Sequence, residues 1–205
     1  MRADLVALVA GMPVRVDELD AAEARLRGGA GSAALPAPGT SEGRQLRRWL
    51  TQLIVTQRVV AAEVAARGLG GRAAPSEDEL LPDPTARLEI GSVAAAALAD
   101  PRARALFADV TSAVRVAEDR VADYHARNPL RFAAPRPDRH GWFVPSSVAP
   151  PLAEVRAVIA DHLRGAARRH AFRVWLDARR EALVRLEPGY EHPGDPRQPD
   201  NTHRH

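Results

Sequence analysis

The chain has 205 residues, of which 45% are hydrophobic and only 4% aromatic, which predicts one domain with a core built mainly from Ala, Val and Leu. All 29 basic residues are arginines and they face 26 acidic residues, so the formal net charge is only +3 and a nucleic-acid partner is not expected. Cysteine is absent, which excludes disulfides, thiolate metal sites and a cysteine nucleophile.

The first predicted elements are two short strands, "LVALVAG" and "MPVRV", joined around Gly11. The apolar run at this end is too short for an export signal. No later stretch approaches the roughly 20 consecutive apolar residues of a membrane span. We therefore expect a cytoplasmic protein with no membrane partner.

Helical patterns dominate the chain after these strands. Asp17 is predicted to cap a helix that ends at Gly28, and Ser41 to open the longest helix of the chain, which ends at Gly68. The apolar residues of this longest helix are three and four positions apart, as on one buried stripe. They are Leu46, Trp49, Leu50, Leu53, Ile54, Val60 and Val64.

The second half of the chain repeats this helical character. Further helices are predicted over residues 86–99, 101–114, 117–128 and 152–183, and a short strand in "ALVRL". The helix that opens at 101 has Asp100 as its cap and Pro101 as its first residue. We expect a connector over 75–84 and a proline-rich irregular one over 129–151.

The last long helix is rich in arginine, and we interpret these side chains as a solvated face. Its expected buried positions are Leu163, Ala167, Ala171, Val174 and Ala178. His162 and His170 lie eight residues apart and are expected at a half-buried boundary or in solvent. In the proline-rich connector, Trp142 and Phe143 follow His140, and aromatic residues in a polar loop are expected to pin it to the core.

Four segments, taken in chain order, resemble one known group of proteins. They are "VALVAGMPVRVDELDAAEARL", "RRWLTQLIVTQRVVAAEVAARGL", "VAEDRVADYHARNPLRF" and the stretch from Pro150 to Leu186. Their order is similar to that of the SurA/PrsA-type peptidyl-prolyl isomerase chaperones. The resemblance implies a mainly α fold, in which long helices pack around a small β-sheet formed by the N-terminal hairpin and a C-terminal strand near Val184.

The chain also departs from this family. Only residues 133–150 stand where the family has its parvulin domain, and they are too few for a sheet-based domain of that type. The resemblance therefore implies a chaperone-like module without prolyl isomerase activity, which binds a peptide or a partner protein. We expect one helical domain over residues 1–188, with 133–151 as its connector, and an apolar binding groove near Trp49, Trp175 and Tyr124.

The polar tail over residues 189–205 suggests an alternative. "HPGD" predicts a type II turn that brings His192 and Asp195 together, and imidazoles with carboxylates suit a divalent metal such as Zn or Fe. The candidate ligands are His192, Asp195, Asp200, His203 and His205, with His140 from the connector. The chain would then be a metal-dependent enzyme or metallo-accessory protein of small-molecule (secondary) metabolism, acting on a small molecule. The plainer interpretation is a solvated tail, and the sequence leaves open whether the protein is an enzyme.

Overall fold

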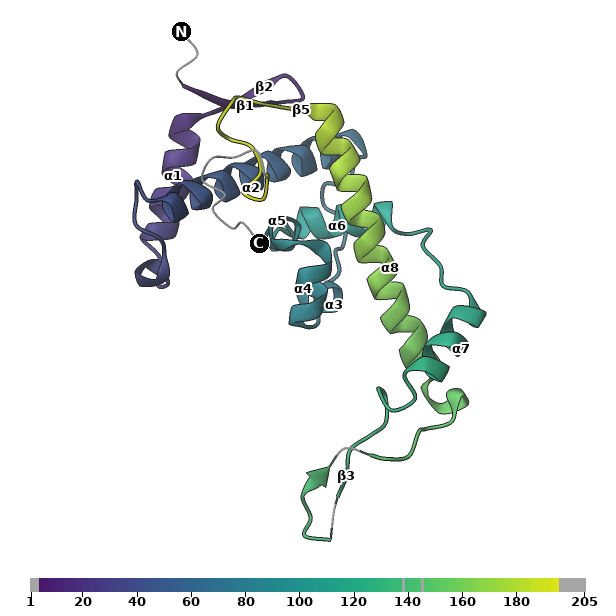
Figure 1. Cartoon of the computed structure of the whole chain (residues 1–205). Coiled ribbons are helices and arrows are strands. Elements are labelled where there is room, and N and C mark those ends of the chain that lie inside the picture. Colours follow the sequence, from purple (N-terminus) through teal and green to yellow (C-terminus); the bar gives the residue numbers. More distant parts are fainter. Residues whose placement is uncertain (1–3, 138, 145, 196–205) are drawn as a thin grey trace.

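The computed structural model describes residues 4–137, 139–144 and 146–195. Helices form a body that carries a three-stranded antiparallel sheet at one end, and a long arm projects from the body at the other end (Figure 1). The predicted fold class, mainly helical with a small sheet, is confirmed. Within the described residues, no helix is both long enough and apolar enough to cross a membrane.

The small sheet joins the two ends of the described chain. Its strands are β1 (Leu5–Val9), β2 (Met12–Arg15) and β5 (Val184–Leu186), in the order β2-β1-β5. Val9 therefore pairs with Met12 on one side and with Val184 on the other. The pairing of the N-terminal hairpin with a strand near Val184 is confirmed.

A two-residue turn at Ala10 and Gly11 connects β1 to β2. Both residues have positive φ, 50° and 80°, which is the pattern of a type I′ turn and suits the twist of a tight hairpin. Helix α1 (Val16–Arg27) follows β2 directly, and its N-cap is Arg15. The prediction that Asp17 caps α1 is wrong, because the helix has already begun there and the Asp17 carboxylate accepts a hydrogen bond from the Glu18 N–H at 2.8 Å inside the first turn.

Helix α2 (Ser41–Ala66) crosses the body and forms the centre of its core. Before it, the loop contains a short 3-10 helix, η1 (Ser32–Ala34). The predicted single stripe is only partly correct, because α2 packs against α1, α5, α6, α8 and β1. Leu50, Val60 and Val64 of the stripe are buried, while the other buried apolar positions of α2 are Val55 and Val59. Five polar or charged side chains of α2 are buried as well: Arg48, Thr51, Gln52, Thr56 and Glu63.

Four short helices cover one side of α2 and α8. They are α3 (Glu77–Leu80), α4 (Pro84–Ile90), α5 (Ser92–Ala97) and α6 (Pro101–Val110). The single helix predicted over 86–99 is two helices, because Gly91 has φ 88° and breaks it. Helix α6 begins at Asp100-Pro101 as predicted, but it ends at Val110, earlier than expected. Helix α3 lies in the predicted connector 75–84.

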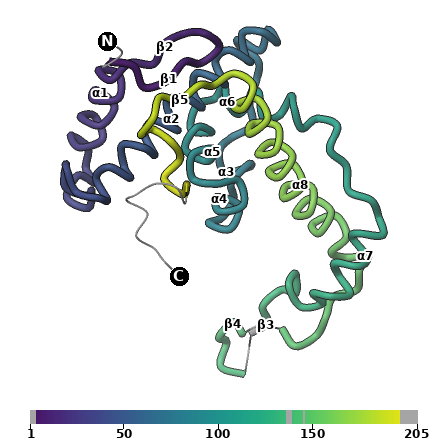
Figure 2. The backbone as a smooth tube through the Cα atoms, turned by 45° about the horizontal axis from the view of Figure 1, so that its top comes forward, coloured from purple at the N-terminus to yellow at the C-terminus, as the bar shows by residue number. Residues whose placement is uncertain are grey.

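Helix α8 (Leu152–Leu183) is the longest, with 32 residues against 26 for α2, so the prediction that Ser41 opens the longest helix is wrong. The C-terminal half of α8 packs on the body, and its N-terminal half extends beyond it beside α7 (Glu118–Arg127) (Figures 1 and 2). The buried face of α8 consists of Val155, Ile159, Arg169, Phe172 and Leu176. The predicted buried face is therefore rotated away from the observed one. Val174 and Ala178 are exposed, and Leu163, Ala167 and Ala171 are only half-buried.

We use the term arm for α7, residues 128–151 and residues 152–163 of α8. Within it, the predicted irregular connector contains a small antiparallel hairpin of β3 (Arg136–Pro137) and β4 (Phe143–Val144). The base of the arm has its own small core of Val121, Val155 and Ile159, separate from the core of the body. The arm thus carries its β3–β4 hairpin away from the body (Figure 2).

Candidate functional site

The tip of the arm exposes large aromatic side chains. Trp142 is 74% and Phe143 76% exposed. The prediction that these residues pin the connector to the core is wrong, because the strands beside them pair with each other, Arg136 with Val144 and Pro137 with Phe143, rather than with an element of the body.

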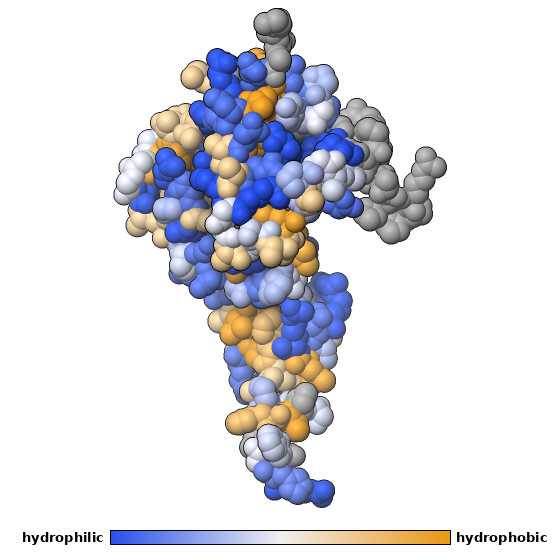
Figure 3. Space-filling view, turned by 90° about the vertical axis from the view of Figure 1, so that its left-hand side faces the viewer, coloured by the Kyte–Doolittle hydropathy of each residue, from blue (hydrophilic) through white to orange (hydrophobic). Residues whose placement is uncertain are grey.

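Exposed apolar side chains are concentrated in this loop. Five of the ten exposed large hydrophobic residues among those described lie between residues 130 and 148, so half of them are in one short segment of the chain. We call these five residues the apolar set of the arm. They are Leu130, Trp142, Phe143, Val144 and Val148. Figure 3 shows hydrophobic side chains gathered along the narrow arm.

A group of three rings fixes the base of the arm. The Tyr124 hydroxyl lies 3.2 Å from His162 Nε2, and the His162 ring centre lies 5.5 Å from that of Tyr124 and 5.7 Å from that of Phe132. Burial among these rings, and next the positive charge of Arg131, lower the pKa of His162. Tyr124 therefore joins α7 to α8 at the base of the arm. His170, the other histidine of α8, is exposed.

The two tryptophans of the expected groove lie apart from each other and from Tyr124. Trp49, near the start of α2, is half-buried and donates a hydrogen bond from Nε1 to Ser92 Oγ at 3.1 Å. Trp175 of α8 stacks on Phe172. The Arg67 guanidinium, just past the end of α2, lies 5.5 Å from the centre of the Trp175 ring. The structure thus places Trp49 and Trp175 toward opposite ends of α2.

The described part of the tail contains the predicted turn but not its predicted type. The Asp195 N–H donates to the His192 carbonyl at 2.9 Å, which closes the turn. Gly194 does not have the positive φ that a type II turn requires. Its N–H donates to His192 Nδ1 at 3.0 Å. Burial, and next the charge of Arg180, lower the pKa of His192, which favours the neutral ring that accepts this bond.

This turn restricts how His192 could bind a metal. Since Nδ1 accepts the Gly194 N–H, a metal on Nε2 would move the ring proton to Nδ1 and break that hydrogen bond. His140 lies at the turn of the β3–β4 hairpin and accepts a hydrogen bond from Arg139 Nε at 3.0 Å. This hairpin lies at the end of the arm away from the body (Figure 1), whereas His192 lines a pocket with Ile90 and Leu176 of the body. Asp200, His203 and His205 lie outside the described residues. Among the described residues, no group of three or more His, Asp or Glu side chains is placed to hold a metal.

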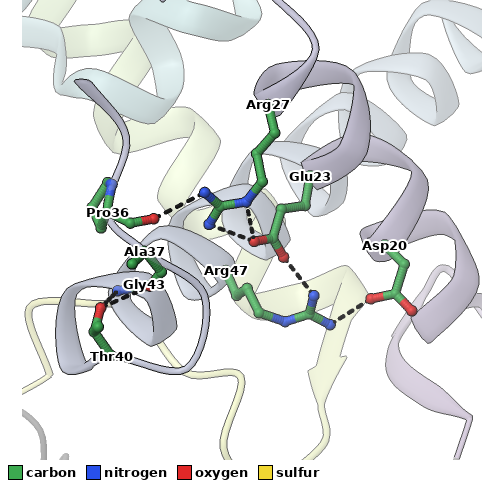
Figure 4. A network of polar contacts seen from close by, with 8 residues as sticks. All are labelled: Asp20, Glu23, Arg27, Pro36, Ala37, Thr40, Gly43 and Arg47. Atoms are coloured by element: carbon green, nitrogen blue, oxygen red, sulfur yellow. Dashed lines mark hydrogen bonds and ion pairs between the residues drawn. The ribbon is translucent and has the colours of Figure 1, made fainter. Parts of the chain in front are cut away.

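A charged network near the N-terminus was not predicted from the sequence (Figure 4). Glu23 accepts hydrogen bonds from Arg27 at 2.8 Å and from Arg47 at 2.6 Å, and Arg47 also binds Asp20 at 2.7 Å. Arg27 donates to the Pro36 carbonyl at 2.9 Å. Burial alone would raise the pKa of Glu23, but the hydrogen bonds from the two arginines outweigh it and lower that pKa. The network therefore ties α1, the following loop and α2 together, which is a structural role.

Residues 5–42 match a protein family described as a family of unknown function (DUF7158). The match covers β1, β2, α1 and the loop into α2, so it includes most of the charged network and none of the arm. No curated protein and no solved structure matches the chain.

Proposed function

We propose that the protein is a chaperone-like module that binds an unfolded peptide segment or a partner protein through its arm, and that it has no prolyl isomerase activity. The observation that carries this proposal is the exposure of Trp142 and Phe143 at the end of the arm. The order of segments shared with the SurA/PrsA-type chaperones supports the same function.

The energetics of the arm favour a binding role. Burying an aromatic or large aliphatic side chain is favourable by about 1.5–3 kcal/mol. A partner that covered the apolar set of the arm would therefore gain a substantial binding free energy. Exposed apolar patches on soluble proteins often mark interaction sites, and tryptophan is enriched among the residues that dominate binding.

The charge of the loop suggests which segments it binds. Residues 129–151 contain three arginines and one aspartate. Arg139 lies at the hairpin turn, exposed, three residues before Trp142. An apolar segment of a client with acidic residues beside it would complement both the aromatic side chains and this positive charge.

The proposal can be tested with insulin reduced by dithiothreitol, whose B chain aggregates. This chain has no cysteine, so the reductant acts on insulin alone. We expect the protein to delay the rise in turbidity, and Trp142→Ser/Phe143→Ser to lose most of that delay. The matched control is Leu88→Ser/Val174→Ser, which removes two exposed hydrophobic residues outside the arm and should protect as the unmodified protein does.

Two outcomes would contradict this function. One is protection by the Trp142→Ser/Phe143→Ser variant that equals that of the unmodified protein. The other is an equal loss in the control, which would assign the effect to general surface hydrophobicity rather than to the arm.

A further inference from the structure

A basic cavity lies between the end of α6 and the middle of α8. Its volume is about 430 Å³, within the range of small-molecule sites. Polar side chains from both elements line it: Thr111, Ser112, Arg115, Arg164 and Arg168. Arg164 and Arg168 are four residues apart on α8 and so share one face, while Thr111 is the C-cap of α6 and Arg115 lies just beyond the turn that follows it. We call this cavity the arginine pocket.

Positive charge in the arginine pocket exceeds the negative charge around it. Arg164 pairs with Asp161. Within the described part of the chain, Arg115 and Arg168 make no ion pair with a carboxylate, whereas the neighbouring Arg169 binds Glu89 at 2.7 Å. Burial, and next the charge of Arg164, lower the pKa of Arg168. An anion in the pocket would relieve this repulsion.

The structure holds the arginines in place for such a ligand. Arg168 Nε donates to Thr111 Oγ1 at 2.9 Å, and the Arg168 guanidinium lies 5.1 Å from the centre of the Phe107 ring. The Thr111 hydroxyl itself donates to the Phe107 carbonyl at 2.6 Å. Arg115 Nη1 donates to the carbonyls of Ser112 and Val114, at 2.7 and 3.0 Å. Side chains fixed in this way lose little conformational entropy when they bind.

We infer that the arginine pocket binds the phosphate group of a small molecule. Some guanidinium N–H groups of Arg115, Arg164 and Arg168 make no hydrogen bond to any described residue. They supply planar, charged donors that match the oxygens of phosphate. The Ser112 hydroxyl is exposed at the edge and adds a neutral donor. The pocket is a single concave site, which fits one phosphate group rather than the extended backbone of a nucleic acid.

Titration calorimetry and thermal melting with inorganic phosphate and glycerol 3-phosphate test this inference, with sodium chloride at the same ionic strength as the reference. We expect saturable binding and a higher melting temperature with both phosphates. Arg168→Gln and Arg115→Gln should each weaken binding by about tenfold or more, because each removes a charged hydrogen-bond donor. The control is Arg25→Gln, an exposed arginine of α1 away from the pocket.

The inference would be overturned by a melting shift with phosphate no larger than with chloride, by binding that survives in both pocket variants, or by an equal loss of binding in Arg25→Gln. Circular dichroism checks the fold of each variant. Among the residues that the structure describes, the Arg115 side chain bonds only to the nearby Ser112 and Val114 carbonyls, so Arg115→Gln keeps the test valid if Arg168→Gln disturbs the contact with α6. Tighter binding to duplex DNA than to glycerol 3-phosphate would overturn the assignment to a small molecule. Since the pocket is separate from Trp142 and Phe143, the insulin assay has an independent outcome.

Discussion

Gly43, in the first turn of α2, shows how one residue fixes the packing of the N-terminal segment. The loop before α2 passes so close that a Cβ atom at residue 43 would lie 2.3 Å from the Ala37 carbonyl oxygen. The Gly43 N–H is bound by the Thr40 side chain at 3.0 Å. The atom in the way belongs to the backbone of Ala37 and not to a flexible side chain, so the loop itself would have to move to make room.

We expect Gly43→Ala to destabilise the protein by about 1–3 kcal/mol, because the loop must shift to admit the methyl group. Alanine favours a helix over glycine by up to about 1 kcal/mol, so a net loss of stability in Gly43→Ala must come from the steric clash. Urea unfolding measures it. Gly31→Ala is the control, since no atom lies within 4 Å of a Cβ there. A Gly43→Ala variant as stable as the Gly31→Ala variant would contradict the close approach.

Buried polar residues were the hardest to predict at this scale. Spacing of apolar residues in α2 indicates Leu50, Val60 and Val64 correctly, since burial of apolar surface is what the pattern records. The burial of Gln52 depends on distant partners: its Nε2 donates to the Tyr190 carbonyl at 2.9 Å, and Arg180 donates to its Oε1. Glu63 is likewise buried against Arg179. These partners are far away in the sequence, so the spacing of residues within α2 cannot predict the pairings.

Among the elements, α7 and α8 are joined by contacts that depend on a histidine. His162 meets Tyr124 and Phe132 in a partly buried cluster. Burial is the largest effect on the pKa of His162 and lowers it, and the positive charges of Arg131 and Arg169 lower it further. The negative charges of Glu89 and Asp83 raise this pKa, but by less, so the net shift is downward. The folded state therefore favours the neutral imidazole.

This shift predicts a pH dependence of stability. In the unfolded chain His162 has its ordinary pKa of 6.5, so the unfolded state binds more protons between that value and the lower pKa of the folded state. Stability that is present above pH 6.5 is then lost as the pH falls below it. We expect His162→Gln to lose less stability than the unmodified protein between pH 7.5 and about pH 5.5, measured by urea unfolding. His170→Gln, at an exposed position of the same helix, should behave as the unmodified protein does; an equal loss in all three would refute the prediction.

Predictions for whole elements were better than those for single contacts. Helix α7 and the Asp100-Pro101 start of α6 follow from capping and periodicity, and both are confirmed. The arm was not foreseen, because the argument for Trp142 and Phe143 assumed that aromatic residues find the core. A short hairpin whose strands pair only with each other leaves those side chains in solvent instead.

For the whole molecule, the sheet explains why the described tail lies against the body. Strand β5 pairs with β1, and the chain beyond it returns over α2, where Gln52 holds the Tyr190 carbonyl at 2.9 Å. The turn at His192 is closed by two hydrogen bonds of its own, from the Asp195 and Gly194 N–H groups. The described tail is thus held to the body at Tyr190, and the metal site expected from the sequence stays a prediction.

Removal of residues 192–205 distinguishes the two functions. The chaperone-like function predicts a nearly unchanged melting temperature and unchanged protection of insulin. The metal hypothesis predicts that the full chain, purified without an affinity tag, carries about one equivalent of Zn or Fe, and that truncation removes the metal and lowers the melting temperature by several degrees. Elemental analysis and thermal melting decide between them. Metal below about a tenth of an equivalent, with no melting shift on added zinc, would end the metal hypothesis.

The central position of β1 also has a consequence during synthesis. The ribosome makes β1 before all the helices of the fold, yet its second neighbour, Val184–Leu186, is made only after them. Until then one edge of β1 carries unpaired N–H and C=O groups, which other nascent chains can pair with, and a two-stranded hairpin alone is only marginally stable. A protein that we propose to hold other unfolded chains would therefore itself be vulnerable to association until β5 has been synthesised.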